Sequence, residues 1–165
     1  MPAPDLQVSV VIPVCNEQDN VLPLAREIVV ALAGRYRFET IFVDDGSTDG
    51  TGPAVHSARA DGMPQVRLIR HSVRSGQSAA IATGVRAARA PWIATLDGDG
   101  QNDPADIPKL LDAARGAGTS RLRLVMGNRT TRRDTWLRRL SSRVANGVRG
   151  SLLRDGTPDT GCGIK

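Results

Sequence analysis

Two aspartates separated by a single glycine, Asp97 and Asp99, are the residues of this chain best suited to chemistry. They follow the apolar run 92–96, which is typical of a short buried strand. Gly98 adds no side chain between them, so two carboxylates can point the same way and bind a cation. Mg²⁺ usually takes one or two carboxylates while phosphates and water complete its shell. The spacing therefore predicts a site for Mg²⁺ or Mn²⁺ with a nucleotide diphosphate as co-ligand.

The same loop has a second interpretation, because Asp and Gly are also common in ordinary turns. In that interpretation, residues 97–103 form turns that start a helix at Pro104. A calcium loop beginning at Asp97 is excluded, since it would need Gly at 102 and Glu at 108, where the chain has Asn102 and Pro108. The chain also lacks a P-loop, and no GxGxxG turn follows its first apolar run.

A second group of acids, Asp44 and Asp45, follows residues 38–43 (FETIFV), a second predicted strand. Acids at the end of a strand commonly reach the hydroxyls of a nucleotide ribose or the polar edge of its base. The residues that follow, Ser47, Thr48 and Asp49, equally suit the capping of a helix. Both roles stay open, for different residues of the segment.

The elements that must position these acids alternate along the chain. Short β-branched runs predict buried strands, and apolar residues three and four apart predict helices. The predicted strands cover residues 8–14, 38–43, 66–69, 92–96 and 122–126. The predicted helices cover residues 20–34, a segment ending at 60, 75–90, 104–117 and 134–153.

This alternation predicts a Rossmann-like α/β domain with a mainly parallel sheet flanked by helices. In such sheets, ligands bind beyond the carboxyl ends of the strands. We therefore expect the loops 15–20, 44–51 and 97–104 to share one rim. The length of 165 residues suits a single domain that covers residues 1–165.

Composition excludes several classes of protein. With 40% hydrophobic and 24% charged residues, the chain does not resemble disordered, collagen-like or coiled-coil proteins. Cys15 and Cys162 form neither a disulfide framework nor a metal-binding pair, which favours a reduced, cytosolic protein. No apolar run approaches the ~20 residues of a membrane span, and we expect no signal peptide.

Positive charge is concentrated in residues 115–154, the basic segment, which holds eleven arginines and one acid. The whole chain has a net charge of +5, so its remainder is net acidic. We expect the basic segment to bind an anionic partner, with Arg129, Arg132 and Arg133 as candidates for contact with phosphate. Its predicted helix suits an anionic membrane surface, although a solvated helix face would also explain the charges. Nucleic acid is not expected, because the chain has five aromatic residues and no standard binding module.

Three motifs together resemble family 2 glycosyltransferases of the GT-A fold in their order and spacing. They are residues 11–17 (VIPVCNE), 43–51 (VDDGSTDGT) and 97–104 (DGDGQNDP). Gly127-Asn128-Arg129 and residues 159–165 (DTGCGIK) are similar to the branch that uses polyprenyl-phosphate acceptors. The resemblance covers nearly the whole chain. It also implies that the GT-A domain is incomplete at its C-terminal end, because relatives continue beyond the last motif.

The resemblance implies that the nucleotide of a sugar donor lies against the first two motifs. The residues that would border it are Pro13, Cys15 and Glu17, and those that would hold its base and ribose are Phe42 and Asp44. Asp45 is a further candidate for binding the substrate. Cys15 departs from the family, where an aromatic residue is common, so a stacking contact on the base is lost. The choice between uridine and guanosine donors therefore stays open.

The resemblance further implies that the third motif surrounds the metal and the diphosphate. The residues implied there are Asp97, Gly98, Asp99 and Gln101. Arg129 would meet a phosphate, and Asp159 is a candidate for a catalytic role on the acceptor side.

The implied reaction is metal-dependent transfer, with inversion, from a nucleotide-diphosphate sugar to a polyprenyl phosphate at the cytoplasmic face of the membrane. Such an acceptor has a second pKa near ~6 and needs no general base, whereas a sugar hydroxyl acceptor would need one. Three alternatives remain: a transferase with a hydroxyl acceptor, a non-catalytic module that binds nucleotide sugars, and a basic adaptor domain. The sequence does not predict the sugar, the lipid or the oligomeric state.

Overall fold

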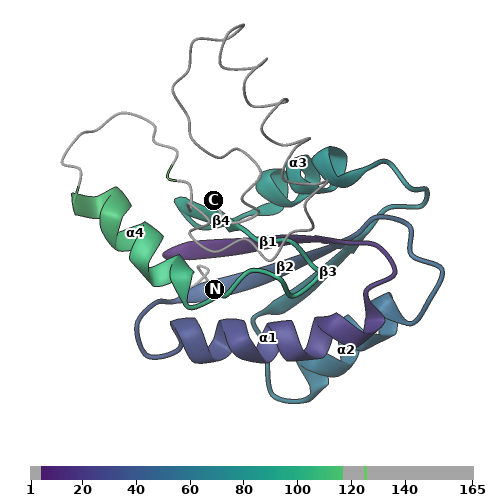
Figure 1. The fold of residues 1–165 in the computed structure, drawn as a ribbon, viewed down its shortest axis with the longest axis horizontal. Coiled ribbons are helices and arrows are strands. Elements are labelled where there is room, and N and C mark those ends of the chain that lie inside the picture. The colour runs from purple at the N-terminus through teal and green to yellow at the C-terminus, as the bar shows by residue number, and fades with distance from the viewer. Residues whose placement is uncertain (1–4, 117–124, 126–165) are drawn as a thin grey trace, which may run out of the picture.

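The computed structural model describes residues 5–116 and residue 125, and Figure 1 shows their arrangement. The strands are β1 (Val8–Val14), β2 (Phe38–Asp44), β3 (Val66–Arg70) and β4 (Trp92–Thr95). The helices are α1 (Gln18–Leu32), α2 (Thr51–Ala60), α3 (Gln77–Ala87) and α4 (Asp106–Gly116). The predicted α/β alternation is confirmed, and the four strands agree with the prediction to within one residue at each end. The predicted strand 122–126, apart from residue 125, and the predicted helix 134–153 lie outside the described residues.

All four strands are parallel and lie in the order β3-β2-β1-β4. The chain builds outward from β1 through β2 to β3, and α3 then carries it back to the other side of β1, where β4 pairs. The strand order therefore reverses between β1 and β4. Open α/β sheets bind ligands beyond the carboxyl ends of the strands at such a point.

Helices cover both faces of the sheet, with α1 and α2 on one face and α3 on the other (Figure 1). Alternate side chains of β1 enter different cores. Val10 and Ile12 pack in the core that includes α1 and α2, whereas Val11 packs with Val43 and Ala80 of α3. All five side chains are fully buried. Burial on both faces explains why every residue of this strand except Ser9 is apolar.

The middle of α3 lies close to the sheet at Gly84. A Cβ atom at this position would lie 2.3 Å from Val11 Cγ1 and 3.1 Å from Val43 Cγ2. Carbon atoms in contact are normally about 3.5–4 Å apart, so a side chain here would force the helix away from the sheet. Glycine therefore sets the distance between α3 and the strands.

A buried carboxylate, Glu39, ties the end of α3 to the amino ends of the strands. Glu39 forms an ion pair with Arg67 of β3 and accepts a hydrogen bond from Ser9 Oγ at 2.8 Å. It also accepts one from the backbone N–H of Arg89 at 2.8 Å, while Arg67 donates to the carbonyl oxygen of Ala87. Burial raises the pKa of Glu39, but these hydrogen bonds outweigh burial and hold the pKa below its ordinary value. Glu39 is therefore a buried anion that anchors the C-terminal end of α3.

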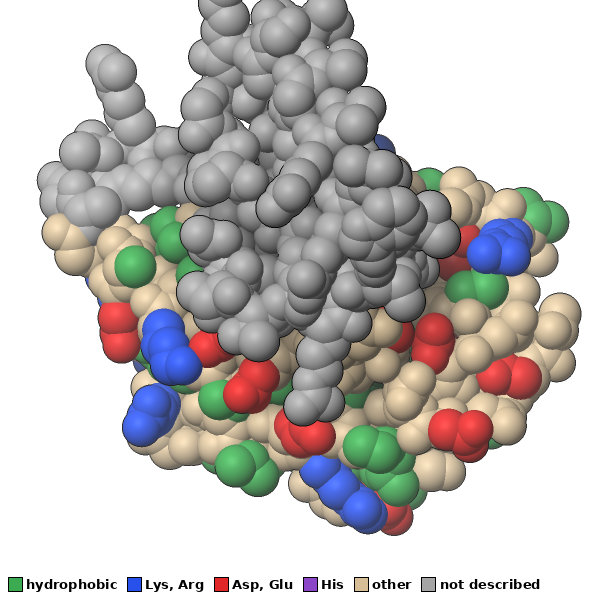
Figure 2. Space-filling view, in the orientation of Figure 1, with side chains coloured by type: hydrophobic (Ala, Val, Ile, Leu, Met, Phe, Trp, Pro, Cys, Tyr) green, Lys and Arg blue, Asp and Glu red, His purple; other side chains and the backbone are tan. Residues whose placement is uncertain are grey.

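The described surface carries charges of both signs. Figure 2 shows Lys and Arg side chains interspersed with Asp and Glu on the face that it presents. Acidic residues outnumber basic residues between positions 5 and 116, as the charge pattern predicts. Among the described helices, none is both long enough and apolar enough to cross a bilayer.

Candidate functional site

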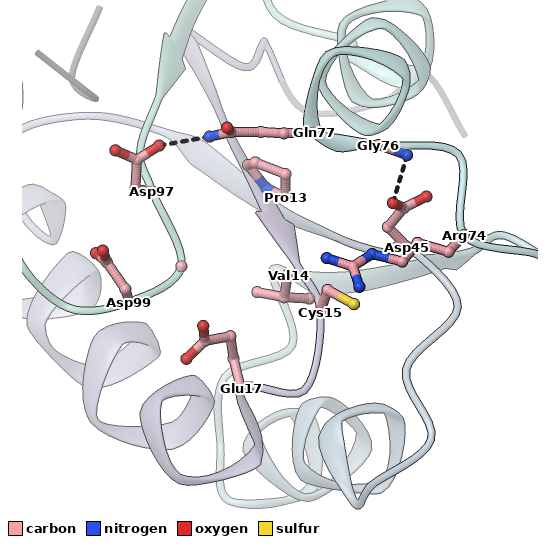
Figure 3. A pocket seen from close by; sticks show the side chains of 11 residues that line it. Pro13, Val14, Cys15, Glu17, Asp45, Arg74, Gly76, Gln77, Asp97 and Asp99 are labelled. Carbon is pink, nitrogen blue, oxygen red and sulfur yellow. Dashed lines mark hydrogen bonds between the residues drawn. The ribbon is translucent and has the colours of Figure 1, made fainter. Parts of the chain in front are cut away.

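A pocket of about 370 Å³ opens beyond the carboxyl ends of β1 and β4, at the point where the strand order reverses (Figure 3). It is lined by residues of the three predicted motifs and of the loop between β3 and α3. The lining residues are Pro13, Val14, Cys15, Glu17, Asp45, Arg74, Gly76, Gln77, Asp97, Gly98 and Asp99. The expected common rim of the three motif loops is thus present in the structure.

Gly98 places the two candidate metal ligands on this rim. The segment after β4 passes over the end of β1, and a Cβ atom at position 98 would lie 2.6 Å from Val14 Cγ1 and 2.8 Å from the carbonyl oxygen of Pro13. Only a residue without a side chain fits there. Asp97 and Asp99, on either side of this contact, both line the pocket.

Among the described residues, neutral amide groups, rather than Lys or Arg side chains, form hydrogen bonds with the two carboxylates. Asp97 Oδ1 accepts a hydrogen bond from Gln77 Nε2 at 2.8 Å, and Asp97 Oδ2 accepts a longer one from Asn102 Nδ2 at 3.4 Å. Asp99 Oδ1 accepts the backbone N–H of Gln101 at 3.0 Å. The turn interpretation is therefore correct for one oxygen of Asp99. The other oxygen of Asp99 has no hydrogen-bond partner among the described residues.

Other acids of these loops form local bonds with the backbone near the starts of helices, although the N-cap residue of α2 is Gly50, which offers no side chain. Asp103 Oδ1 accepts the backbone N–H of Ala105 at 2.9 Å, just before α4. Asp49 Oδ1 accepts the backbone N–H of Thr51, the first residue of α2, at 3.0 Å. Asp103 and Asp49 are thus occupied with local backbone, which leaves Asp97 and Asp99 directed to the pocket.

The donor set suits a divalent cation that shares its shell with a phosphate ligand. The described residues contain no cluster of three His, Cys, Asp or Glu side chains that could hold a metal without help. Two carboxylates that line one pocket fit the usual coordination of Mg²⁺, which proteins bind through one or two carboxylates together with substrate phosphates. Gln101 is exposed and does not line the pocket, so its role as a ligand stays a prediction.

Hydrogen bonds between two motifs hold Cys15 and Glu17 in place. The backbone N–H of Asn16 donates to Ser47 Oγ at 2.9 Å, and Asn16 Oδ1 accepts the backbone N–H of Thr48 at 2.9 Å. Next to them, the backbone N–H of Glu17 donates to Thr51 Oγ1 at 2.9 Å. Residues 15–18 and 47–51, which we call the joined loops, therefore form one unit at the pocket rim.

The carboxylate of Asp45 is occupied by the loop that leads into α3. It accepts the backbone N–H groups of Ser75 (2.8 Å) and Gly76 (2.7 Å), and it bonds to His71 Nδ1 at 2.8 Å. Burial raises the pKa of Asp45, but the hydrogen bonds from Ser75, His71 and Gly76 outweigh burial and lower the pKa overall. Asp45 lines the pocket while its carboxylate anchors the start of α3, and its predicted contact with the nucleotide stays a prediction.

The structure does not bring Phe42 and Asp44 to the pocket. Phe42 is fully buried in the core, so it exposes no surface to a base, and the predicted contact is corrected to a packing role. Asp44 is also fully buried, and its Oδ1 accepts the backbone N–H of Ser47 at 2.8 Å. Asp44 Oδ2 lies 3.3 Å from Arg70 Nε, but the angles are wrong for a hydrogen bond, so this oxygen has no such partner among the described residues.

Arg74 and Gln77 line the pocket although the sequence motifs do not include them. Both belong to the segment that follows β3, and the rule that ligands bind beyond the carboxyl ends of strands could have found them. Arg74 is the one basic residue among the described residues that line the pocket. Figure 3 shows its side chain extending into the pocket from the side opposite Asp97 and Asp99.

The candidates on the acceptor side lie outside the described residues. They are Arg129, Arg132, Arg133 and Asp159, together with most of the basic segment. Their roles stay predictions.

Comparison with known sequences identifies relatives along most of the chain. Residues 9–162 match the sequence pattern of Glycosyl transferase family 2. A dodecaprenyl-phosphate galacturonate synthase of Rhizobium johnstonii is 36% identical over 99% of this chain and 48% of its own length. An undecaprenyl-phosphate 4-deoxy-4-formamido-L-arabinose transferase of Pseudomonas paraeruginosa is 40% identical over 88% of this chain and 42% of its own length. The chain spans about half the length of the curated relatives it matches.

Solved structures share the same fold at lower identity. A mannosyltransferase from Pyrobaculum calidifontis, solved with GDP-Man and Mn²⁺, has a TM-score of 0.56 at 24% identity and covers 72% of this chain and 34% of its own. The glucosyl-3-phosphoglycerate synthase of Mycobacterium tuberculosis, solved with Mn²⁺, UDP and glucosyl-3-phosphoglycerate, has a TM-score of 0.54 at 23% identity. It covers 66% of this chain and 39% of its own. These likenesses confirm the predicted GT-A type of α/β fold.

Proposed function

The chain belongs to glycosyl transferase family 2, and from this we propose that the protein is a metal-dependent, inverting glycosyltransferase. It would move a sugar from a nucleoside-diphosphate sugar to a polyprenyl phosphate. The observation that carries the proposal is the pocket in which Asp97 and Asp99 lie across from Arg74. The names of the curated relatives, which specify dodecaprenyl- or undecaprenyl-phosphate, support the acceptor.

The charges that line the pocket support a donor that arrives with a metal ion. Four carboxylates, those of Glu17, Asp45, Asp97 and Asp99, face a single guanidinium among the described lining residues. An anionic diphosphate would be repelled by this surplus of negative charge. A divalent ion held by Asp97 and Asp99 would reverse the sign on that side, and Arg74 can bind a phosphate oxygen pair from the other. Bound there, the ion would neutralise the charge of the departing diphosphate.

The proposed reaction needs few groups from the protein. An oxygen of the acceptor phosphate forms a bond to the anomeric carbon, the bond from that carbon to the diphosphate breaks, and the nucleoside diphosphate leaves. The phosphate acceptor is largely dianionic at neutral pH, since its second pKa is about 6, so no general base has to be supplied. Asp97, Asp99 and Arg74 would bind and orient the donor, while Cys15 and Glu17 would border its nucleotide.

The basic segment would bind the polyprenyl-phosphate acceptor. We assign contact with the lipid phosphate to Arg129, Arg132 and Arg133, and the approach to the anionic, cytoplasmic surface of the membrane to the remaining arginines of this segment. Asp159 is the acceptor-side carboxylate of the proposal. Mg²⁺ and Mn²⁺ are both candidates for the ion, and the two solved neighbours contain Mn²⁺.

Binding and turnover together test this function. Calorimetry with UDP and GDP, each with and without Mn²⁺, should show a complex that forms only with the metal. We expect Asp99→Asn to weaken that complex at least tenfold, since outer-shell changes alone cost 10–100-fold and this one removes a ligand. Arg74→Gln should weaken diphosphate binding without changing the affinity for the nucleoside.

Glu27→Gln, which removes an exposed charge on α1 away from the pocket, is the matched control and should bind normally. Nucleotide binding that is unchanged both by EDTA and by the Asp99→Asn substitution would contradict the proposed metal site. Transfer to a short polyprenyl phosphate distinguishes a transferase from a module that only binds the donor. Transfer to a sugar hydroxyl instead would contradict the proposed acceptor.

A further inference from the structure

Gln77 makes the shortest hydrogen bond to the pocket carboxylate Asp97. Its Nε2 lies 2.8 Å from Asp97 Oδ1, whereas Asn102 Nδ2 lies 3.4 Å from Oδ2. The assignment of the Gln77 amide is unambiguous, because a carboxylate only accepts and must therefore face the NH₂ end. Gln77 and Asp97 come from different elements, the first turn of α3 and the segment after β4. The bond thus links two different elements at the pocket.

The start of α3 is fixed before Gln77 by the carboxylate of Asp45. That carboxylate binds the two backbone N–H groups just ahead of Gln77, those of Ser75 and Gly76. It also binds His71, whose Nε2 reaches Thr83 Oγ1 of α3 at 2.9 Å. Two turns of the helix are therefore tied to the end of β2.

The rest of α3 is held at two further points. Gly84 allows the helix to rest directly on Val11 and Val43, at a distance that no side chain would permit. At the C-terminal end, Glu39 binds the backbone of Arg89, and its ion-pair partner Arg67 binds the carbonyl oxygen of Ala87. A helix held at its start, middle and end cannot slide along the sheet without breaking buried contacts. Gln77 accordingly projects from a fixed support.

We propose that Gln77 is a positioning residue that holds the Asp97 carboxylate in the orientation needed to bind the divalent ion. This inference rests on the proposed function, since it assumes that Asp97 is a metal ligand. In protein metal sites, a ligating carboxylate is commonly held in its orientation by hydrogen bonds from neighbouring groups that do not themselves bind the metal. A neutral amide suits this task because it orients the carboxylate without adding a positive charge that would compete with the ion. A Lys at position 77 would add such a charge, and a Leu would leave only the longer bond from Asn102 to orient the carboxylate.

The test is the affinity for Mn²⁺ in the presence of UDP or GDP, measured as loss of the free Mn²⁺ signal in electron paramagnetic resonance. Gln77→Met keeps the length of the side chain and removes the donor. We expect this variant to bind Mn²⁺ about tenfold more weakly than the wild-type chain. Because the Gln77 side chain is exposed, the thermal unfolding midpoint of the Gln77→Met variant should equal that of the wild-type chain. Gln77→Lys should weaken Mn²⁺ binding further, because its positive charge would compete with the ion for Asp97.

Gln65→Met is the matched control, because Gln65 lies just before β3 and away from the pocket, and the backbone bond from Thr40 to its carbonyl oxygen does not involve its side chain. This control should bind Mn²⁺ like the wild type. If wild type and Gln77→Met bind Mn²⁺ equally well, the positioning role is overturned while the proposed function stands. If the wild-type chain binds no Mn²⁺ with either nucleotide, both proposals are overturned. A loss of affinity that is matched by a loss of folded protein would show a structural role and would also overturn the inference.

Discussion

Gly98 shows how a single missing side chain can determine the geometry of a site. Its Cα passes so close to Val14 and to the Pro13 carbonyl that even one methyl group has no space. The neighbouring aspartates depend on that close approach, because any displacement of the backbone at position 98 moves both carboxylates. Packing therefore requires glycine at position 98, and this glycine affects the site only through the placement of its two neighbours.

We predict that Gly98→Ala destabilises the fold by about 1–3 kcal/mol, the usual cost of overpacking, and weakens nucleotide binding in the presence of Mn²⁺. Chemical denaturation and calorimetry measure the two effects. Gly116→Ala is the control, since no described atom lies within 4 Å of a Cβ built there and Ala favours a helix, so this change should be neutral or slightly stabilising. Equal behaviour of the two variants would contradict the packing argument.

At the scale of elements, α3 is the helix whose first residue, Gln77, lines the pocket and bonds to Asp97. Glu39, near the start of β2, binds the backbone at the C-terminal end of α3. Asp45, directly after β2, binds the backbone at the start of α3. Both carboxylates are buried. Burial raises the pKa of each, but their hydrogen bonds lower both pKa values overall. The unfolded chain therefore binds protons more readily than the folded one at these sites, so folding is favoured above the unfolded pKa values.

This linkage gives a prediction with a definite sign. Stability should be constant near neutral pH and fall as the pH drops below about 4, through the lowered pKa values of Glu39 and Asp45. Glu39→Gln should lower the free energy of unfolding at pH 7 and reduce its loss between pH 5 and pH 3. Urea denaturation at several pH values measures both effects. Glu27→Gln, at an exposed position, should keep the wild-type slope, and an unchanged slope in Glu39→Gln would refute the assignment.

The sequence predicted the elements well because hydrophobic periodicity is a local property. The rim of the pocket was predictable too, since parallel strands end at a common edge. Phe42 shows where local reasoning fails, because a central strand with helices on both faces buries every side chain between its ends. Asp45 and Gln77 show a second limit: their partners lie 30 and 20 positions away, so only the folded chain reveals that one anchors α3 and the other meets Asp97.

At the scale of the whole molecule, charge separates the described part from the basic segment. Residues 5–116 are net acidic, whereas residues 115–154 hold eleven arginines and one acid. An anionic membrane attracts each nearby basic residue by about 1 kcal/mol, and salt screens this attraction. The proposed membrane contact should therefore depend on this segment and on ionic strength.

We predict that the chain sediments with vesicles that contain phosphatidylserine at 0.1 M salt, and that it is released at 0.5 M salt or from vesicles of phosphatidylcholine alone. Replacing both Arg138 and Arg139 by Gln should weaken binding about 30-fold, since each change removes roughly 1 kcal/mol. Arg26→Gln together with Arg59→Gln, two exposed positions on α1 and α2, is the matched control and should bind like the wild type. Binding that is insensitive to salt would rule out this electrostatic contact.

The joined loops have a consequence for engineering. The backbone of Asn16 and Glu17 bonds to the side chains of Ser47 and Thr51, and the side chain of Asn16 bonds to the backbone of Thr48, so each loop depends on side chains of the other. A chimera that borrows residues 15–18 from another member of the family could leave the backbone N–H groups of Thr48 and Gly50 without the side-chain acceptors that Asn16 and Gln18 supply. Attempts to alter which nucleotide is recognised should therefore graft both segments together, as one cassette.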